Sequence, residues 1–213
     1  MSAAAEHTFL FVDLAGFTAL TEAHGDEHAA DLAERFVSIV ESELDGESRL
    51  VKTLGDAVLL VAEDPASGLR TCRSVLERLD REPDFPVPRS GIHHGPAVER
   101  SGEFFGSAVN LTARLAAQAH GGQVLATSHV AEAARVLGYP VVDLGEFALK
   151  NIAERVRLFD VHIGPRSDAI AIDPICRMKV DIDQAAGRLR VEGVDHWFCS
   201  LECAATFLRD HVS

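Results

Sequence analysis

Short apolar runs alternate with longer amphipathic segments through the first 163 residues of this chain. Apolar positions three and four apart predict helices over 26–44, 65–79, 107–119 and 130–136, and Asp26 is expected to cap the first of these. Runs rich in branched residues predict strands over 8–12, 49–52, 57–62, 89–98, 123–126, 141–149 and 155–162. Because strands and helices alternate with mixed spacing, we expect an α/β (α+β) domain that ends near Ile163.

The composition limits the partners that we expect. The chain has 213 residues, of which 47% are hydrophobic and 25% charged, so it is long enough for one ordinary domain and a small module. A formal net charge of −13 opposes binding to nucleic acid or anionic lipid. The N-terminus has no basic residues before its first apolar run, and no run reaches transmembrane length. We therefore expect a cytoplasmic protein with no nucleic-acid or membrane partner.

Two aspartates far apart in the chain have similar surroundings. Asp13 follows the apolar run 8–12 and precedes Gly16, whereas Asp56 follows Gly55 in the turn of a predicted hairpin. Glycine lets the backbone approach a phosphate closely. Two carboxylates beside exposed amides suit Mg²⁺ and a nucleoside triphosphate. A phosphoryl-transfer site is therefore predicted here.

An amide and a guanidinium add to this prediction. Asn110 and Arg114 lie at i and i+4 of a predicted helix, so they share a face. Ala108, Leu111 and Leu115 supply a separate packing stripe. An arginine in this position can stabilise charge on a phosphoryl group, whereas the alternative for this pair alone is an ordinary solvated surface.

Several motifs in the first domain, in their order and spacing, together resemble the class III adenylyl/guanylyl cyclase catalytic domain. The resemblance covers about residues 7–162. Its motifs are Phe11-Val12-Asp13-Leu14-Ala15-Gly16-Phe17-Thr18, Lys52-Thr53-Leu54-Gly55-Asp56, Gly91-Ile92-His93-His94-Gly95, Phe105-Gly106-Ser107-Ala108-Val109-Asn110-Leu111-Thr112-Ala113-Arg114 and Leu149-Lys150-Asn151.

This resemblance implies a ferredoxin-like domain that forms a head-to-tail homodimer, with each active site built from both chains. Two Mg²⁺ or Mn²⁺ ions would be held by Asp13 and Asp56, with help from the Leu14 carbonyl. The partner chain would contribute Asn110 to orient the ribose and Arg114 to stabilise the transition state. The resemblance also implies a triphosphate site, made of Gly16, Phe17, Thr18 and Lys150, although Arg155 and Arg157 lie near Lys150 in the sequence.

Base choice follows from hydrogen bonding. Adenine presents an acceptor at N1 and a donor at its amino group, and guanine presents the opposite pair. Lys52 is a donor and Glu103 an acceptor, so this pair suits ATP. Glutamate is one methylene longer than the aspartate that is frequent at this position of adenylyl cyclases. The alternative for Glu103 is a solvated turn residue.

The last 43 residues differ in character and hold three of the four cysteines. The stretches Asp173-Pro174-Ile175-Cys176 and His196-Trp197-Phe198-Cys199-Ser200-Leu201-Glu202-Cys203 resemble a YHS domain. The resemblance implies a zinc or copper site with ligands Cys176, Cys199 and Cys203. His196 is the nearest candidate for a fourth ligand, and Asp173 or water remains open. The alternative is an apolar module with buried thiols.

We therefore expect a cyclase domain over 1–163, a linker over 164–170 and a YHS-like module over 171–213. The leading hypothesis is an adenylate cyclase that makes 3′,5′-cyclic AMP and pyrophosphate from ATP, regulated by the C-terminal module. One alternative is a guanylate cyclase. Another is a metal sensor or carrier whose cyclase-like part serves only for dimerisation.

Overall fold

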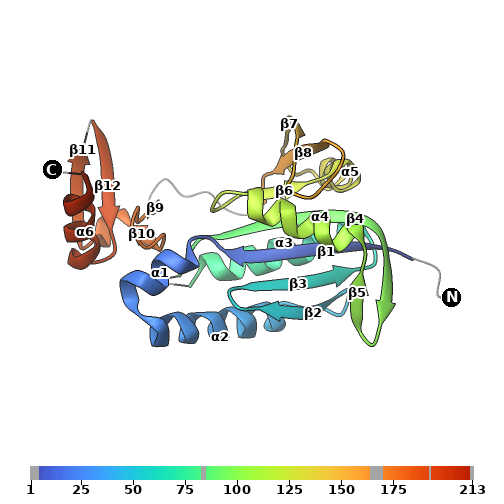
Figure 1. Cartoon of the computed structure of the whole chain (residues 1–213), viewed down its shortest axis with the longest axis horizontal. Coiled ribbons are helices and arrows are strands. Elements are labelled where there is room, and N and C mark those ends of the chain that lie inside the picture. The colour runs from blue at the N-terminus through green and yellow to red at the C-terminus, as the bar shows by residue number, and fades with distance from the viewer. Residues whose placement is uncertain (1–4, 83–84, 164–169, 192, 212–213) are drawn as a thin grey trace.

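A computed structural model describes residues 5–82, 85–163, 170–191 and 193–211. An eight-stranded sheet forms the centre of the larger part of the molecule (Figure 1). Its strands are β1 (Ala5–Leu14), β2 (Ser48–Leu54), β3 (Ala57–Ala62), β4 (Pro88–Arg100), β5 (Glu103–Phe105), β6 (Val124–Ala126), β7 (Val141–Phe147) and β8 (Val156–Val161). The helices around it are α1 (Phe17–His24), α2 (Asp26–Ser42), α3 (Pro65–Asp80), α4 (Ser107–Gln118) and α5 (Ser128–Val136).

The strand order is β2-β3-β1-β4-β6-β8-β7, with β5 paired to β4. The first four of these strands pair antiparallel, and helices connect β1 to β2 and β3 to β4. This is the split βαβ arrangement of ferredoxin-like folds. The expected fold class is therefore confirmed.

Helices cover the two faces of the sheet unequally. Along β1, Leu10, Val12 and Leu14 belong to the core that α2, α3 and α5 complete. Phe9 and Phe11 point to the opposite face and pack in a second core with α4. Because successive side chains of a strand alternate between faces, Asp13 lies on the same face as Phe9 and Phe11. This is the face on which the site is built.

Two local details differ from the sequence expectation. The short helix α1 was not expected, since only Phe17 and Leu20 mark its apolar side. Helix α2 was expected to be capped by Asp26, but Gly25 occupies the cap position and Asp26 is the first helical residue. Asp26 still places a negative charge in the first turn, where the helix dipole favours it.

The C-terminal residues form a small unit of two hairpins and a helix. Its elements are β9 (Ile170–Ile172), β10 (Lys179–Asp181), the 3₁₀ turn η1 (Ile182–Gln184), β11 (Gly187–Val191), β12 (Val194–Phe198) and α6 (Leu201–His211). The rings of Phe198 and Phe207 are 5.3 Å apart in its interior. Most of the expected linker, residues 164–169, lies outside the described residues, and Ile170 already belongs to β9.

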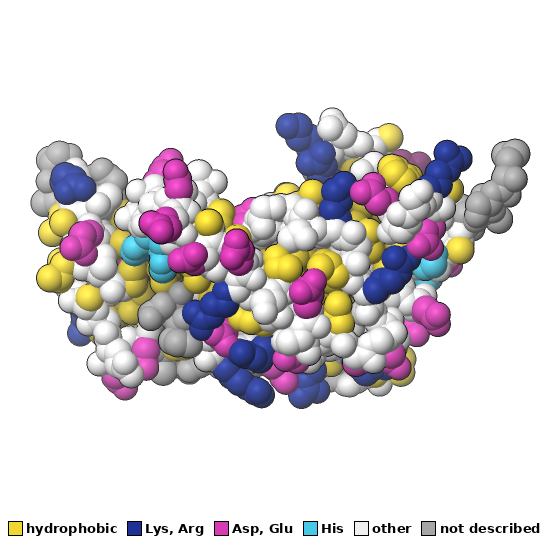
Figure 2. Space-filling view, turned by 90° about the horizontal axis from the view of Figure 1, so that it is seen from below, with side chains coloured by type: hydrophobic (Ala, Val, Ile, Leu, Met, Phe, Trp, Pro, Cys, Tyr) yellow, Lys and Arg dark blue, Asp and Glu magenta, His cyan; other side chains and the backbone are white. Residues whose placement is uncertain are grey.

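This C-terminal unit lies beside α1, at one end of the large sheet (Figure 1). Its buried residues Cys176, Met178 and Phe198 belong to the same hydrophobic cluster as the core of the larger domain. Figure 2 shows acidic and basic side chains interspersed over the α2 side of the molecule. No helix among the described residues is long and apolar enough to cross a membrane.

Candidate active site

The two aspartates singled out from the sequence meet at one edge of the sheet. Asp13 lies near the end of β1, directly opposite Ala57 of β3, so Asp56 is its neighbour across the strand pair. The Leu14 amide donates a 3.1 Å hydrogen bond to the Asp56 carbonyl and fixes this register. Both side chains are partly exposed. The arrangement leaves two carboxylates accessible beside each other.

Asp13 has a partner that sequence reasoning missed. Arg89 of β4 lies opposite Asp13, and its Nε and Nη2 atoms are 2.7 and 2.6 Å from Asp13 Oδ2. Burial raises the pKa of Asp13, Arg89 lowers it, and the nearby Asp56 raises it again. The carboxylate pair thus carries repulsion that one guanidinium partly offsets. A divalent cation would offset it more completely.

The backbone of the segment after Asp13 has the features of an anion-binding site. Gly16 has φ +82°, a left-handed conformation that glycine adopts without strain, and it caps the N-terminus of α1. The first amides of a helix have no partners within the helix, and the helix dipole favours negative charge there. The Ala15 amide is already bonded to the Val87 carbonyl at 3.2 Å. The amides of Phe17 and Thr18 therefore suit the triphosphate.

Lys52 and Glu103 come together although they are 51 residues apart in the chain. Lys52 Nζ donates a 3.4 Å hydrogen bond to Glu103 Oε1, and the two side chains are 48% and 50% exposed. Lys52 is paired with Leu59 across the strands, which places it on the same sheet face as Phe11 and Asp13. One donor and one acceptor thus stand side by side on the face that carries the aspartates.

Helix α4 is held close to β4 by the absence of a side chain. A Cβ atom at Gly91 would lie 2.6 Å from the Thr112 carbonyl oxygen and would overlap the Ala116 amide. The buried stripe of α4 runs through Ala108, Thr112, Leu115 and Ala116, whereas Leu111, expected in it, is half-buried. Asn110 is exposed and Arg114 is half-buried, so both remain available to a ligand or a second chain.

The remaining expected residue, Lys150, is exposed in the loop between β7 and β8. The neighbouring arginines are engaged elsewhere, because Arg155 donates to the Glu146 carbonyl at 2.7 Å and Arg157 lies 3.7 Å from Asp143. Within the described part of this one chain, no hydrogen bond or ion pair joins Asn110, Arg114 or Lys150 to either aspartate. The single chain therefore presents two separate groups of site residues.

A family model described as the adenylate and guanylate cyclase catalytic domain matches residues 1–162. This chain belongs to that family. The match ends before the C-terminal unit, so the cyclase domain accounts for the large sheet and its helices only.

Relatives and solved structures agree with this assignment. A pH-sensitive adenylate cyclase of Mycobacterium tuberculosis is 37% identical over 161 residues, which are 74% of this chain and 41% of that protein. An adenylate cyclase of Glutamicibacter nicotianae is 36% identical over 59% of this chain and 31% of its own length. This chain thus spans less than half the length of these relatives. The crystal structure of the adenylyl cyclase CyaB from P. aeruginosa superposes with a TM-score of 0.66 and 19% identity, over 79% of this chain and 99% of that one.

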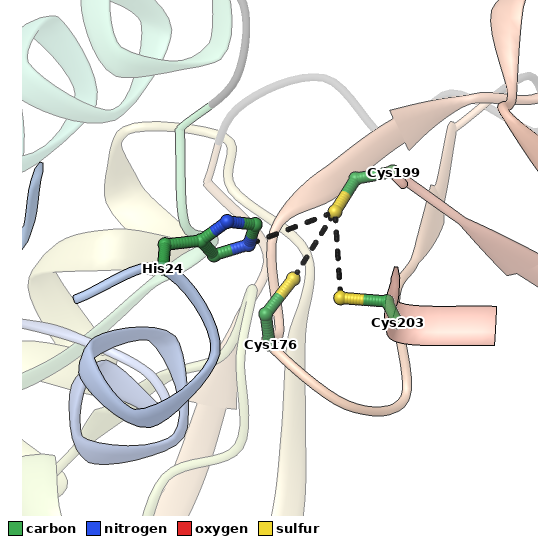
Figure 3. A group of neighbouring side chains, drawn as sticks. All are labelled: His24, Cys176, Cys199 and Cys203. Atoms are coloured by element: carbon green, nitrogen blue, oxygen red, sulfur yellow. Dashed lines mark hydrogen bonds between the residues drawn. The ribbon is translucent and has the colours of Figure 1, made fainter. Parts of the chain in front are cut away.

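A second group of reactive side chains lies between the cyclase domain and the C-terminal unit. Cys176, Cys199 and Cys203 converge with His24, the last residue of α1, and their ligand atoms all lie within 4.8 Å of one another (Figure 3). A hydrogen bond with Cys176, together with burial, raises the pKa of Cys199, and burial raises that of Cys203 to about 11. Without a metal, these two thiols are therefore protonated at neutral pH.

The other two candidates for a fourth ligand have different partners. The ring of His196 packs on Phe207, with centroids 4.7 Å apart. Asp173 is fully buried and accepts hydrogen bonds from the amides of Ile175, Cys176 and Cys199 at 2.8, 3.3 and 2.9 Å. It holds the two cysteine-bearing loops together, and its negative charge beside the Cys199 thiol helps to raise the pKa of that thiol. The structure therefore places His24 beside the cysteines.

Proposed function

We propose that this protein is an adenylate cyclase, which converts ATP to 3′,5′-cyclic AMP and pyrophosphate. The observation that carries the proposal is the pair Asp13 and Asp56, joined at one edge of the sheet beside the amides that begin α1. The adenylate cyclases named among the relatives support it. Because ATP is the substrate, we place the enzyme in the cytoplasm.

The residues at this edge fit divalent cations. Asp13 and Asp56 offer carboxylate oxygens, the ligands that Mg²⁺ and Mn²⁺ prefer, and the mutual repulsion of these groups favours a cation between them. The Leu14 carbonyl would add a further oxygen. Two such ions, when bound, would activate the ribose 3′-oxygen and neutralise the triphosphate. Arg89 would release Asp13 when a cation binds and would remain beside the phosphates as a positive charge.

The chain's own residues would orient the substrate. The amides of Gly16, Phe17 and Thr18 would hold the triphosphate, together with Lys150. Lys52 would donate to adenine N1, and Glu103 would accept from the adenine amino group. Guanine would place an acceptor against Glu103 and a donor against Lys52, so this pair disfavours a guanylate cyclase.

We also propose that the enzyme is a head-to-tail homodimer. Asn110 would orient the ribose and Arg114 would stabilise the developing charge in the site of the partner chain. This division between two chains agrees with the structure of one chain, in which Asn110 and Arg114 make no hydrogen bond or ion pair with Asp13 or Asp56 among the described residues. Exposed apolar side chains, Leu54 at 44% and Phe105 at 54% exposure, lie near Asp56 and Glu103 in the chain and would be covered by a partner.

We propose that residues 164–170 are a linker and that the residues from 171 onward form a YHS-like module. This module would bind zinc or copper through Cys176, Cys199 and Cys203. The convergence of the three thiols supports this part of the proposal. It also favours a second candidate function, that of a metal sensor whose cyclase-like domain is catalytically silent.

The test is cyclic nucleotide formation by the purified protein, with ATP and GTP offered separately, each with Mn²⁺ and with Mg²⁺. Cyclic AMP from ATP is expected, and Asp13→Ala should lower kcat at least about 100-fold. Asp31→Ala, an exposed acid on α2, is the matched control and should keep full activity. Product from GTP alone would favour a guanylate cyclase.

The variant Asp56→Asn distinguishes an active cyclase from a catalytically silent metal sensor. In an enzyme this change abolishes turnover, because one of the two carboxylates is lost. In a silent sensor there is no turnover to lose, and metal uptake by the C-terminal module is unchanged. No product from either nucleotide, with a metal-loaded module, would overturn the cyclase proposal.

A further inference from the structure

His24 belongs to the cyclase domain, whereas the three cysteines near it come from the C-terminal module (Figure 3). Cys199 Sγ lies 3.3 Å from Cys176 Sγ, 3.9 Å from Cys203 Sγ and 3.9 Å from His24 Nε2. The four ligand atoms surround a common centre, and the side chains point toward it from α1, from the loop after β9, from the end of β12 and from α6 (Figure 3).

These three spacings lie within about 0.5 Å of the edges of a tetrahedral zinc site. With metal–sulfur and metal–nitrogen bonds of about 2.3 and 2.0 Å, the edges of such a site are about 3.5 to 3.8 Å long. Sulfur atoms in a disulfide are much closer, and the four cysteines are free. Three thiolates and one imidazole suit a borderline metal such as Zn²⁺, with no open coordination position.

The cysteine loops are already fixed in this geometry. The buried carboxylate of Asp173 binds the amides of Cys176 and Cys199, and the Ser200 hydroxyl accepts from the Cys203 amide at 3.1 Å at the start of α6. Ligands that are held in place by such outer contacts lose little conformational freedom on binding a metal. The module thus presents three prepositioned thiols to α1.

Both ends of α1 contact the module. At its C-terminal end His24 meets the thiols. At its N-terminal end the aliphatic carbons of Arg177 lie directly on Gly16, so that a side chain at Gly16 would overlap them. Ala19, Ala23 and Ile175 line a pocket between α1 and α6. The module therefore contacts α1 at both ends and along one side.

A second set of contacts keeps the module on the cyclase domain. Met178 forms a bridge with Pro86, and the Lys179 ammonium group donates to the carbonyls of Leu79 and Asp80 at 2.9 Å each, at the C-terminal end of α3. These contacts do not depend on a metal. On the α1 side of the interface, a 3.9 Å hydrogen bond joins His24 to the Cys199 thiol, and a metal would replace it with bonds to all four side chains.

We infer that His24 is the fourth ligand of a zinc site that clamps α1, and with it the triphosphate loop at Gly16, to the C-terminal module. The coupling rests on the proposed cyclase site. A bound metal fixes the far end of α1, and the amides at its near end then hold ATP in place. Since these amides contact the triphosphate in both ground and transition state, metal loss should raise KM and leave kcat nearly unchanged.

The first test measures zinc binding directly on the full-length protein. Zn²⁺ affinity is determined by competition with a chromogenic chelator, and Co²⁺ replaces Zn²⁺ to report the donor set through its visible absorption. His24→Ala should lower Zn²⁺ affinity at least about tenfold and shift the Co²⁺ bands as nitrogen is lost. His24→Cys supplies a fourth thiolate and should restore the affinity, which shows that the variants still fold.

Two histidines serve as controls. His28, whose ring is 5.6 Å from that of His24, and His196, which packs on Phe207, should both tolerate alanine with no change in Zn²⁺ affinity or Co²⁺ spectrum. Unchanged affinity in His24→Ala, with loss in His196→Ala, would overturn the inference and leave metal binding by the module intact. Failure of the native protein to bind Zn²⁺ would overturn both the role of His24 and metal binding by the module.

The second test measures the coupling without turnover. Binding of 3′-deoxy-ATP, which lacks the attacking hydroxyl, is compared between zinc-loaded and zinc-stripped protein. We expect about fivefold weaker binding after stripping and, by reciprocity, about fivefold weaker Zn²⁺ binding without the nucleotide. The coupling would be overturned if the nucleotide affinity were the same with and without zinc, and the zinc affinity the same with and without the nucleotide. If 3′-deoxy-ATP does not bind at all, the cyclase proposal fails, whereas the zinc affinities still decide the role of His24.

Discussion

At the scale of single residues, we assign the proposed choice of base to the ion pair between Lys52 and Glu103. Both side chains are about half exposed and contact each other at 3.4 Å, so each can turn to a purine that enters between them. Exposed pairs of this kind contribute little to stability, because water screens them. Their exchange should therefore alter specificity rather than folding.

The double variant Lys52→Glu with Glu103→Lys tests this idea. It keeps one donor and one acceptor but reverses their positions, so guanine should replace adenine as the better fit. We expect kcat/KM for ATP to fall about tenfold or more relative to GTP, since one mispaired polar contact costs at least that much. Unchanged preference, measured with both nucleotides in competition, would remove the pair from base recognition.

His93 provides a prediction about pH. Burial lowers its pKa from 6.5 to about 4, and the neighbouring His94 and His129 add to this effect. The unfolded chain therefore binds a proton between pH 6.5 and 4 that the folded chain does not, and stability falls as the pH falls through this window. The slope approaches about 1.4 kcal/mol per pH unit.

The measurement is urea unfolding at several pH values, compared with His93→Gln. Glutamine keeps a polar group near Thr127, which lies 2.7 Å from the His93 ring, but does not titrate. The variant should show a flatter dependence between pH 4 and 6.5. If the free energy of unfolding depended on pH equally in the two proteins, His93 would not account for the loss of stability at low pH.

The sequence predicted the candidate site residues that belong to local motifs, but it missed neighbours that only the long-range register of the strands brings to them. Asp13 and Asp56 were found because each lies beside a glycine turn. Arg89 was missed, since only the antiparallel pairing of β1 with β4 brings it to Asp13. His24 was missed for the same reason, because the fold, and not the spacing along the chain, decides which histidine meets the cysteines.

At the scale of secondary structure elements, the position of α4 depends on a close approach to β4. Gly91 faces the α4 backbone at Thr112 and Ala116, and this contact sets the distance between the helix and the sheet. Asn110 and Arg114 move with α4. A change at Gly91 therefore alters the site without touching its side chains.

Gly91→Ala should lower the free energy of unfolding by about 2 kcal/mol, because the new methyl group meets backbone atoms that cannot rotate away. Cyclase activity should fall as well, through displacement of Arg114. Gly187→Ala in β11 is the control, since its methyl group would be at an ordinary distance of 3.6 Å from Ala204. Thermal unfolding and kcat are measured for both; equal behaviour of the two variants would contradict the prediction.

Strong periodicity made most elements predictable. Helices α2, α3 and α4 and the central strands agree with the expected ranges to within a few residues, because each carries a long apolar stripe or run. Helix α1 could not be predicted, since it has eight residues and Leu20 is the buried one among them. The ring at the centre of the C-terminal core is Phe198, whereas the indole of the adjacent Trp197 lies under the Arg188 guanidinium.

At the scale of the whole molecule, the proposed dimer makes a testable statement about shared sites. Asp13→Ala and Arg114→Ala should each be inactive alone. When equal amounts are unfolded and refolded together, mixed dimers hold one site with both native residues. About a quarter of the native activity should return, since half of the dimers are mixed and each has one working site. No recovery would mean that both residues act within one chain.

Composition predicted only part of the boundary between the cyclase domain and the C-terminal module. Clustered cysteines after residue 170 predicted a separate module, and a sheet hairpin does begin there. The burial of Cys176 and Met178 in the cluster that contains residues of α1 and α2 was not predictable from composition. Apolar character shows that a residue is buried, but it does not show which partner covers it.

The placement of His24 and Cys176 also bears on how the chain comes apart. A bound metal would join two points separated by about 150 residues into a closed ring, and a link of that span restricts the unfolded ensemble by about 5 kcal/mol in the chain-entropy description. Mechanical pulling on the two ends would then extend only the segments outside the ring, which include β1 and most of α1, until the metal is released. Chelation would lengthen the contour that a pulling experiment records, without any change in the folded contacts of the sheet.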